Sequence, residues 1–175
     1  DKYGGVVPEL ASREHLRSLL PLTKQALFES DLDLACLSKI AVTTGPGLKG
    51  SLLTGLNFAA GLAAALKKPL IPINHLEGHV LSAFIDSKSR PQCNFPFLTL
   101  LISGGHTQII LAKQIGKYEL LGETVDDSIG ETFDKVSQEL GYGYPGGPII
   151  EELAKKGDPT KHPFPKPLFK KQGLN

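Results

Sequence analysis

The first half of the chain alternates helix-like and strand-like hydrophobic patterns. Over residues 9–29, apolar side chains recur every three or four positions between charged ones, which predicts an amphipathic helix. A β-branched run at 39–44 and an apolar run at 70–73 predict two strands, separated by a helix of small residues at 49–66. This order, with another helix after residue 73, is typical of a mostly parallel α/β layer.

The second half follows a different pattern. Two apolar runs, at 97–102 and 107–112, predict strands joined by a tight hairpin through Ser103-Gly104-Gly105-His106. A third strand is predicted at 118–125, followed by helices at 129–140 and 146–155.

The segment 86–96, between the two halves, is polar and flanked by proline, as linkers often are. It predicts two domains, 1–88 and 89–175, in a protein of the α/β class. Neither end of the chain carries a natural boundary signal, so we expect an internal fragment of a longer protein.

The composition is that of a globular protein without a strong global charge. Apolar residues make up 41% of the chain, charged residues 21%, and the formal net charge is +1. A nucleic-acid partner would therefore need a local basic patch. The most apolar stretch, 52–66, is too short and too interrupted to cross a bilayer, so no membrane contact is expected. Two cysteines without paired spacing, Cys36 and Cys93, indicate reduced thiols and a cytoplasmic location.

Two histidines, His75 and His79, lie one helical turn apart and could bind one metal ion together. The segment differs from the HExxH signature of zinc proteases, in which the glutamate directly follows the first histidine. Glu77 stands two residues after His75, about 200° around the helix, and so would point away from the metal. This offset argues against simple zinc hydrolysis. The alternative to metal binding, a chance pair in which His79 is a hydrogen-bonded core residue, stays open on these residues alone.

Three glycine-rich turns stand at element boundaries. In the turn at 45–51, no lysine stands directly before the hydroxyl residue Ser51, as a P-loop requires. The turn therefore predicts either a helix start that favours anions or a close-packed strand-to-helix turn. The Gly104-Gly105 turn would expose backbone N–H groups suited to a phosphate, or be an ordinary hairpin. A third glycine pair, Gly146-Gly147, opens the last predicted helix.

An acidic row on the predicted helix at 129–140 could bind sugar hydroxyls or a cation. Asp127, Glu131 and Asp134 are spaced to share one helical face, although such a row is usually a solvated surface. Together with the histidines and the glycine turns, it suggests a metal–nucleotide site.

Several longer motifs resemble the TsaD (Gcp/Kae-type) family, over nearly the whole chain and in order. These are residues 3–13 (YGGVVPELASR), 45–48 (GPGL), 75–79 (HLEGH), 101–107 (LISGGHT) and 133–135 (FDK). The resemblance implies the two-lobed fold of actin, Hsp70 and sugar kinases (the ASKHA fold). It also implies transfer of a threonylcarbamoyl group from threonylcarbamoyl-AMP to the N6 amine of the adenosine next to the anticodon, in tRNAs that read codons beginning with adenine.

The resemblance further implies roles for individual residues. His75 and His79 would bind one divalent metal, iron or zinc, whose third protein ligand would lie after Asn175. A substrate phosphate and carbamoyl region would be lined by Leu101, Ile102, Ser103, Gly104 and Gly105. Asp134 would hold the ribose hydroxyls and Gly147 would contact the adenosine.

The expected partners are tRNA, threonylcarbamoyl-AMP and the partner proteins of a threonylcarbamoyl-transfer complex. Because part of the cleft would lie outside the chain, we expect the fragment alone to be inactive. Two other function classes remain, a metallopeptidase and a non-catalytic nucleotide-binding scaffold.

Overall fold

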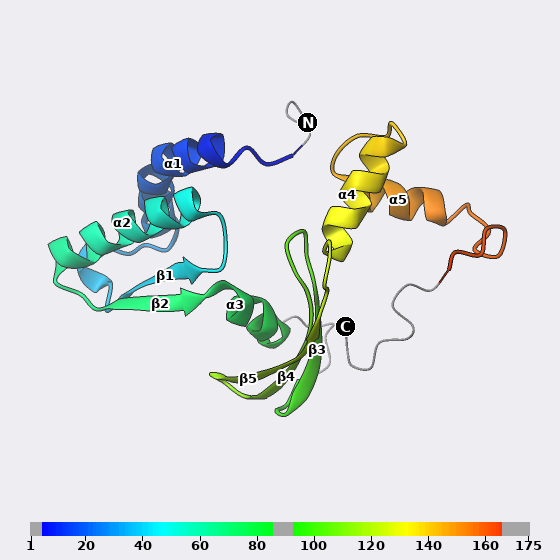
Figure 1. The fold of residues 1–175 in the computed structure, drawn as a ribbon. Helices are drawn as coiled ribbons and strands as arrows, with labels where there is room; N and C mark the ends of the chain where they lie inside the picture. The colour runs from blue at the N-terminus through cyan, green and yellow to red at the C-terminus, as the bar shows by residue number, and fades with distance from the viewer. Residues whose placement is uncertain (1–4, 86–92, 166–175) are drawn as a thin grey trace. The chain divides into compact units, whose positions relative to one another are not determined.

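A computed structural model describes residues 5–85 and 93–165, which divide into two compact units (Figure 1). The first unit is Val6–Ile85, and the second holds the described residues from 93 onward. Both units contain helices and strands, so the predicted α/β class is confirmed. The proposed linker falls mainly on residues 86–92, which lie outside the described residues.

The first unit is a parallel strand pair covered by helices. Its elements are α1 (Pro8–Glu29), a short 3₁₀ turn (Leu34–Cys36), β1 (Ile40–Gly45), α2 (Lys49–Leu66), β2 (Leu70–Asn74), α3 (His75–Leu81) and a second 3₁₀ turn (Ser82–Phe84). Strands β1 and β2 run parallel, with Ile40 opposite Leu70 and Thr43 opposite Ile73. A crossover helix is needed to connect parallel neighbours, and α2 is that helix.

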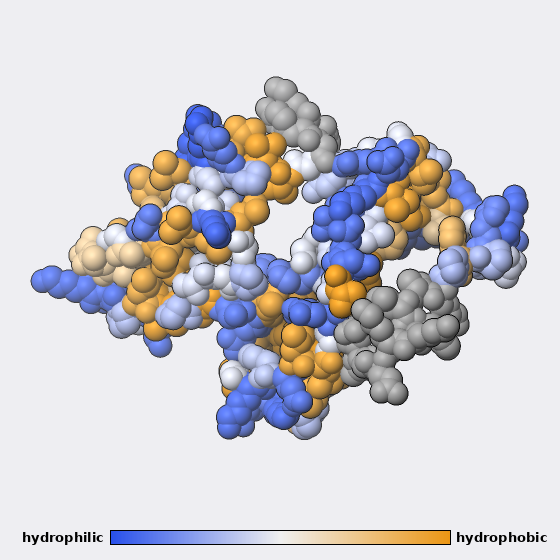
Figure 2. All heavy atoms as spheres, in the orientation of Figure 1, coloured by the Kyte–Doolittle hydropathy of each residue, from blue (hydrophilic) through white to orange (hydrophobic). Residues whose placement is uncertain are grey.

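Small side chains let α2 lie close to its neighbours. Ala59 and Ala63 are buried, and α2 contacts both α1 and β1. Other apolar side chains of this unit reach its surface, among them Leu16 and Phe28 of α1, and Figure 2 shows hydrophobic residues interrupting the hydrophilic surface there.

The second unit begins with an antiparallel meander and ends in two helices. Its elements are β3 (Phe97–Ile102), β4 (Thr107–Gln114), β5 (Lys117–Glu123), α4 (Ile129–Glu139) and α5 (Gly146–Ala154). The strand order is β3-β4-β5, and Ile102 pairs with Thr107 where the glycine turn closes the first hairpin. The predicted hairpin is therefore confirmed.

The two faces of β3 have different surroundings, because alternate side chains of a strand point to opposite faces. Leu101 is buried, as are Ile110 and Ala112 of β4. Leu98, Leu100 and Ile102 share the other face of β3 and are 62%, 61% and 49% exposed.

Candidate functional site

The histidine pair lies on a short helix that begins directly at the end of β2. Asn74, the last residue of β2, caps α3: its side-chain oxygen accepts hydrogen bonds from the backbone N–H groups of Leu76 (2.8 Å) and Glu77 (3.2 Å). The cap makes His75 the first helical residue, so that His79 follows one turn later on the same side of the helix. Asparagine directly before an apolar helix is a cap signal that the sequence itself carries.

The two imidazoles are close enough to share a metal ion. Their Nε2 atoms are 3.2 Å apart, and the ring centroids are separated by 4.5 Å with the planes at 67°. Two nitrogens bound tetrahedrally to zinc at about 2.0–2.1 Å stand about 3.3–3.4 Å from each other. The pair therefore fits two ligands of one metal. Both histidines are exposed, so the alternative that His79 is a core residue is wrong.

A metal bound by this pair would need further ligands. Within residues 5–85 and 93–165, no group of three histidine, cysteine or acidic side chains is placed to hold a metal. His75 and His79 would supply two positions, and a third protein ligand after Asn175 stays a prediction.

One wall of a hollow of about 540 Å³ is formed by His75. The glycine turn at 45–51 forms much of the rest, through Pro46, Gly47 and Ser51, and His15 of α1 completes its polar lining. A Cβ at Gly50 would meet the Ser12 side chain, so the turn packs closely against α1. This close packing favours the strand-to-helix interpretation of the turn. Within the described part of the chain, the Ser51 hydroxyl is buried without a hydrogen-bond partner.

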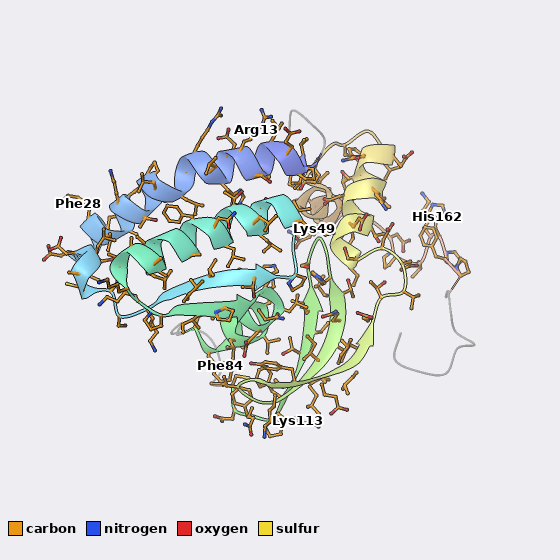
Figure 3. The ribbon with its side chains drawn as sticks, turned by 60° about the vertical axis from the view of Figure 1, so that its left-hand side comes forward. Arg13, Phe28, Lys49, Phe84, Lys113 and His162 are labelled. Atoms are coloured by element: carbon orange, nitrogen blue, oxygen red, sulfur yellow. The ribbon has the colours of Figure 1, made fainter. Side chains whose placement is uncertain are left out.

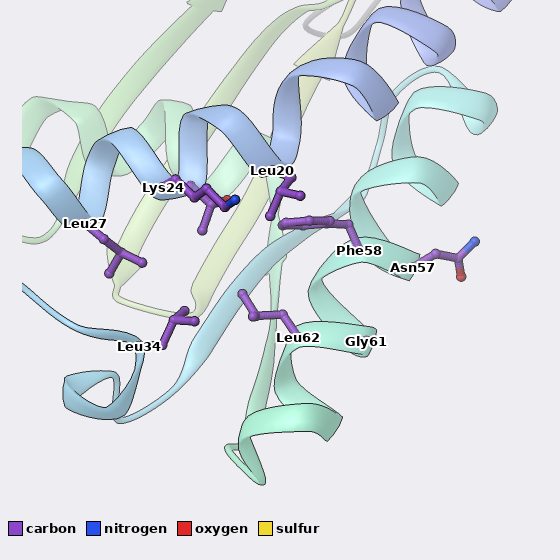
Figure 4. Close-up of a pocket in the computed structure, with 9 residues that line it drawn as sticks. Leu20, Lys24, Leu27, Leu34, Asn57, Phe58, Gly61 and Leu62 are labelled. Carbon is purple, nitrogen blue, oxygen red and sulfur yellow. The ribbon is translucent and has the colours of Figure 1, made fainter.

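A second hollow, of about 360 Å³, lies between α1 and α2 and is lined mainly by apolar side chains (Figure 4). Leu20 and Leu27 of α1 face Phe58 and Leu62 of α2 across it, and Leu34 closes one end. No histidine, cysteine or acidic residue lines it, so it is a gap in helix packing and not a candidate for catalysis.

In the second unit, the Ser103–His106 turn is held by its own serine. The backbone N–H of Ser103 donates to the carbonyl oxygen of His106 (2.8 Å), and the Ser103 hydroxyl accepts from the N–H groups of Gly105 (3.3 Å) and His106 (3.0 Å). The N–H of Gly104 has no hydrogen-bond partner in the described part of the chain. The expectation of phosphate-binding amides therefore rests first on Gly104.

The two residues before the turn, Leu101 and Ile102, differ in the exposure of their side chains. Leu101 is buried and Ile102 is half exposed on the opposite face of β3. A ligand at the turn would therefore meet Leu101 through its backbone only.

Asp134 and Gly147 come together where α5 starts beside α4. An Asp134 carboxylate oxygen accepts a hydrogen bond from the backbone N–H of Gly146 at 2.7 Å. The Gly147 Cα has open space around it, whereas a Cβ at Gly146 would overlap the backbone of Phe133. The structure thus places two of the predicted site residues, Asp134 and Gly147, at one helix junction, and it gives Asp134 a structural partner that the sequence did not suggest.

The predicted acidic row needs a correction. Asp127 precedes the cap residue Ser128 and is not part of α4, because α4 begins at Ile129. The ammonium group of Lys135 binds Asp127 (2.8 Å) and Glu131 (3.0 Å), and these hydrogen bonds raise the pKa of Lys135 above its ordinary value. Two members of the row therefore share one ion-pair partner, Lys135, whereas Asp134 bonds to the Gly146 N–H. A capping-box pattern, Ser128 followed by Glu131, agrees with the predicted helix start at residue 129 and leaves Asp127 outside the helix.

Comparison with known proteins identifies the family. The model of the TsaD family, tRNA N6-adenosine threonylcarbamoyltransferase, matches residues 1–174. The chain belongs to the TsaD family.

Relatives within the TsaD family are highly similar. The tRNA N6-adenosine threonylcarbamoyltransferase of Methylibium petroleiphilum is 54% identical over 175 residues, which is 100% of this chain and 49% of that protein. The protein of the same name from Bordetella pertussis is 51% identical over 168 residues, or 96% of this chain and 48% of that protein. The chain thus spans about half the length of the curated relatives it matches. Among solved structures, YeaZ from Pseudomonas aeruginosa aligns over 63% of this chain and 51% of its own, with 21% identity and a TM-score of 0.44.

Other surface features bear on the partners expected for a TsaD-family chain. Arg13 and Arg17 of α1 form ion pairs of 2.6 Å with Glu9 and Glu14. Lys49, at the start of α2, has no ion pair within the described residues, and Figure 3 shows both Arg13 and Lys49 on their helices. Among the described residues, no helix combines the length and the apolar character needed to cross a membrane.

Proposed function

We propose that the protein carrying this chain transfers the threonylcarbamoyl group of threonylcarbamoyl-AMP to the N6 amine of the adenosine next to the anticodon, in tRNAs that read codons beginning with adenine. The observation that supports this most directly is the TsaD-family match over residues 1–174, which includes both the histidine helix and the glycine turn. The relatives that are about half identical to this chain carry the name of the same activity.

We propose further that the two units are parts of the two lobes of an ASKHA fold. The parallel β1-α2-β2 arrangement supports this for the first unit, and the β3–β4 hairpin followed by two helices supports it for the second. The division into 1–88 and 89–175 as lobes stays a prediction, and so does a cytoplasmic location.

The reaction forms one bond and breaks one. The N6 nitrogen of the adenosine bonds to the carbamoyl carbon, the bond from that carbon to the phosphate oxygen breaks, and AMP leaves with the electron pair while the amine loses a proton. His75 and His79 would hold iron or zinc, which supplies Lewis acidity toward an oxygen of the transferred group when it is bound.

The remaining proposed site residues bind and orient. Among the described residues, the N–H of Gly104 has no hydrogen-bond partner, so it would donate to a phosphate oxygen, and such donors stabilise the negative charge of a leaving phosphate. The Asp134 oxygen that does not bind Gly146 would accept a ribose hydroxyl. Gly147, where no described atom lies within 4 Å of the position that a Cβ would take, would contact the adenosine.

Complementation tests the function. In cells depleted of their own TsaD-family enzyme, the full-length protein should restore threonylcarbamoyladenosine, measured by mass spectrometry of nucleosides from bulk tRNA. Such cells supply the partner proteins that the complex would need. If the adenosine stays unmodified while the protein accumulates in folded form, the proposal is wrong.

The histidine pair is tested in the same system. The double variant His75→Ala/His79→Ala should lose both the modification and the stoichiometric iron or zinc found by elemental analysis of the purified protein. His162→Ala, a histidine in the exposed segment after α5, is the matched control and should retain both. Full metal content in the double variant would exclude His75 and His79 as ligands.

A further inference from the structure

The first turn of α4 holds two consecutive carbonyl groups of the Ser103–His106 turn. The Ser128 hydroxyl donates a hydrogen bond to the carbonyl oxygen of Gly104 at 2.9 Å, and the N–H of Gly130 donates to the carbonyl oxygen of Ser103 at 3.3 Å. Residues 24 and more positions apart in the sequence are thereby joined.

The geometry of the peptide group fixes the directions of the N–H groups that follow these two carbonyls. In a planar trans peptide, the C=O and the following N–H point in opposite directions. Because the carbonyls of Ser103 and Gly104 point toward α4, the N–H groups of Gly104 and Gly105 point away from it. Two successive N–H groups directed to one side form a concave site that favours an anion. The Gly105 N–H is occupied by the Ser103 hydroxyl (3.3 Å), so of the two only the Gly104 N–H is without a partner among the described residues.

The start of α4 packs tightly against the backbone of the Ser103–His106 turn. A Cβ at Gly130 would lie 2.6 Å from the carbonyl oxygen of Ser103 and 2.9 Å from the Cα of Gly104, which are backbone atoms that cannot rotate away. Ser128 is 3% exposed, and the Thr107 hydroxyl accepts the N–H of Ile129 at 2.9 Å. These contacts fix the start of α4 against both ends of the turn.

The same contacts occupy the amides at the start of α4. Ile129 donates to Thr107, Gly130 to Ser103 and Glu131 to the Ser128 hydroxyl at 3.2 Å. Helix starts bind anions through such groups when they are unpaired. Here they are used to hold the turn, so an anion in this region would bind the turn and not the helix.

We infer that Ser128 and Gly130 are positioning residues for a phosphate-binding site centred on the Gly104 amide. The inference rests on the proposed function, since that function supplies the adenylate whose phosphate would be bound. Ser128 acts through the Gly104 carbonyl and Gly130 through the absence of a side chain, and neither touches the ligand.

Comparing two ligands isolates the phosphate contribution. The dissociation constants of AMP and of adenosine are measured by calorimetry with the full-length protein, and their ratio reports the gain from the phosphate. Ser128→Ala should reduce that ratio by about tenfold, the value of one charge-assisted hydrogen bond, while adenosine affinity changes little. Gly130→Ala should reduce it at least as much, because its methyl group displaces the turn.

Two further variants separate positioning from loss of stability. Ser128→Asp keeps an oxygen that can cap α4 but has no proton for the Gly104 carbonyl, and so it should also lose the phosphate gain if Ser128→Ala folds poorly. Thr132→Val removes the hydrogen bond from the Thr132 hydroxyl to the Ser128 carbonyl (2.9 Å) without touching the turn, and it should keep the wild-type ratio.

The outcomes distinguish the inference from the function on which it rests. An unchanged ratio in folded Ser128→Ala or Ser128→Asp, beside a wild type that prefers AMP, overturns the positioning role alone. An equal loss of AMP and adenosine affinity overturns it as well, because that is the result of a general structural role. A wild type that binds neither ligand contradicts the proposed function itself.

Discussion

Replacement of Asp134 should weaken both the fold and ligand binding. The 2.7 Å hydrogen bond from the Gly146 N–H makes this carboxylate a cap for α5, whose own cap residue, Pro145, offers no side-chain acceptor. Loss of such a cap costs about 0.5–2 kcal/mol. Because the bond is short and half-buried, we expect Asp134→Ala to lower the free energy of unfolding by about 1–2 kcal/mol.

Replacement of Asp134 should also lower ligand affinity, independently of its effect on stability. With one carboxylate oxygen occupied by Gly146, the other can accept one ribose hydroxyl, a charge-assisted bond worth about 1.5–3 kcal/mol. Asp134→Ala in the full-length protein should therefore weaken a non-hydrolysable threonylcarbamoyl-adenylate analogue by about tenfold or more. Asp134→Asn keeps an acceptor for Gly146 and loses the charge, so it should lose affinity with a much smaller effect on stability.

Calorimetric titration and urea unfolding of the same preparations provide the two measurements. Asp127→Ala, which removes an exposed carboxylate paired with Lys135, is the control. It should change neither the ligand affinity nor the free energy of unfolding by much. Wild-type affinity in both Asp134 variants would show that the residue only caps α5. A change in stability of Asp134→Ala below about 0.5 kcal/mol would instead refute the capping argument.

Three other predictions follow from the structure. Asn74→Ala should lower the metal content of the full-length protein, because it removes the cap that starts the histidine helix, whereas Asn74→Asp should retain the metal, since aspartate caps equally well; elemental analysis decides, and equal metal content in both would contradict this. Binding of tRNA by the full-length protein should weaken steeply as salt rises, because bound phosphates release counterions, and an affinity independent of salt would exclude a phosphate-dominated contact. Hydrogen bonds from the Thr160 hydroxyl and N–H lower the pKa of Asp158, so any stability they give is present above the ordinary carboxyl range and lost as pH falls through the depressed pKa; NMR titration should find this pKa raised in Thr160→Ala, and an unchanged value would show that the hydroxyl bond is not formed.

Regular patterns in the sequence were sufficient to predict most of the elements. Residues 49–66 form α2 with the predicted bounds, because the run contains no proline and ends before Lys67, which adopts a left-handed conformation. Residues 97–102 form β3 with the predicted bounds for a similar reason, since a proline precedes the run and the glycine turn follows it. In both cases the residues that start and end the element lie within it or next to it, so the sequence of that segment alone is enough to predict its bounds.

The candidate site was predictable only in part. The spacing of His75 and His79 fixed their relation once a helix was assumed, and the structure gives that relation as a 3.2 Å approach. The place of Asp127 was mistaken because the acidic row was continued two residues before the helix start, which had itself been predicted correctly at residue 129. The bond from Ser128 to Gly104 joins segments that meet only in three dimensions, and no local pattern indicates it.

The open face of β3 has a practical consequence for anyone who handles the chain by itself. Leu98, Leu100 and Ile102 form a row of aliphatic side chains directed at water, on a strand rich in residues that favour sheet formation. Rows of this kind promote association between copies, so the isolated chain should be prone to aggregate at high concentration. Biochemical work is better begun with the complete protein, and a fragment that precipitates would say little about its catalytic competence.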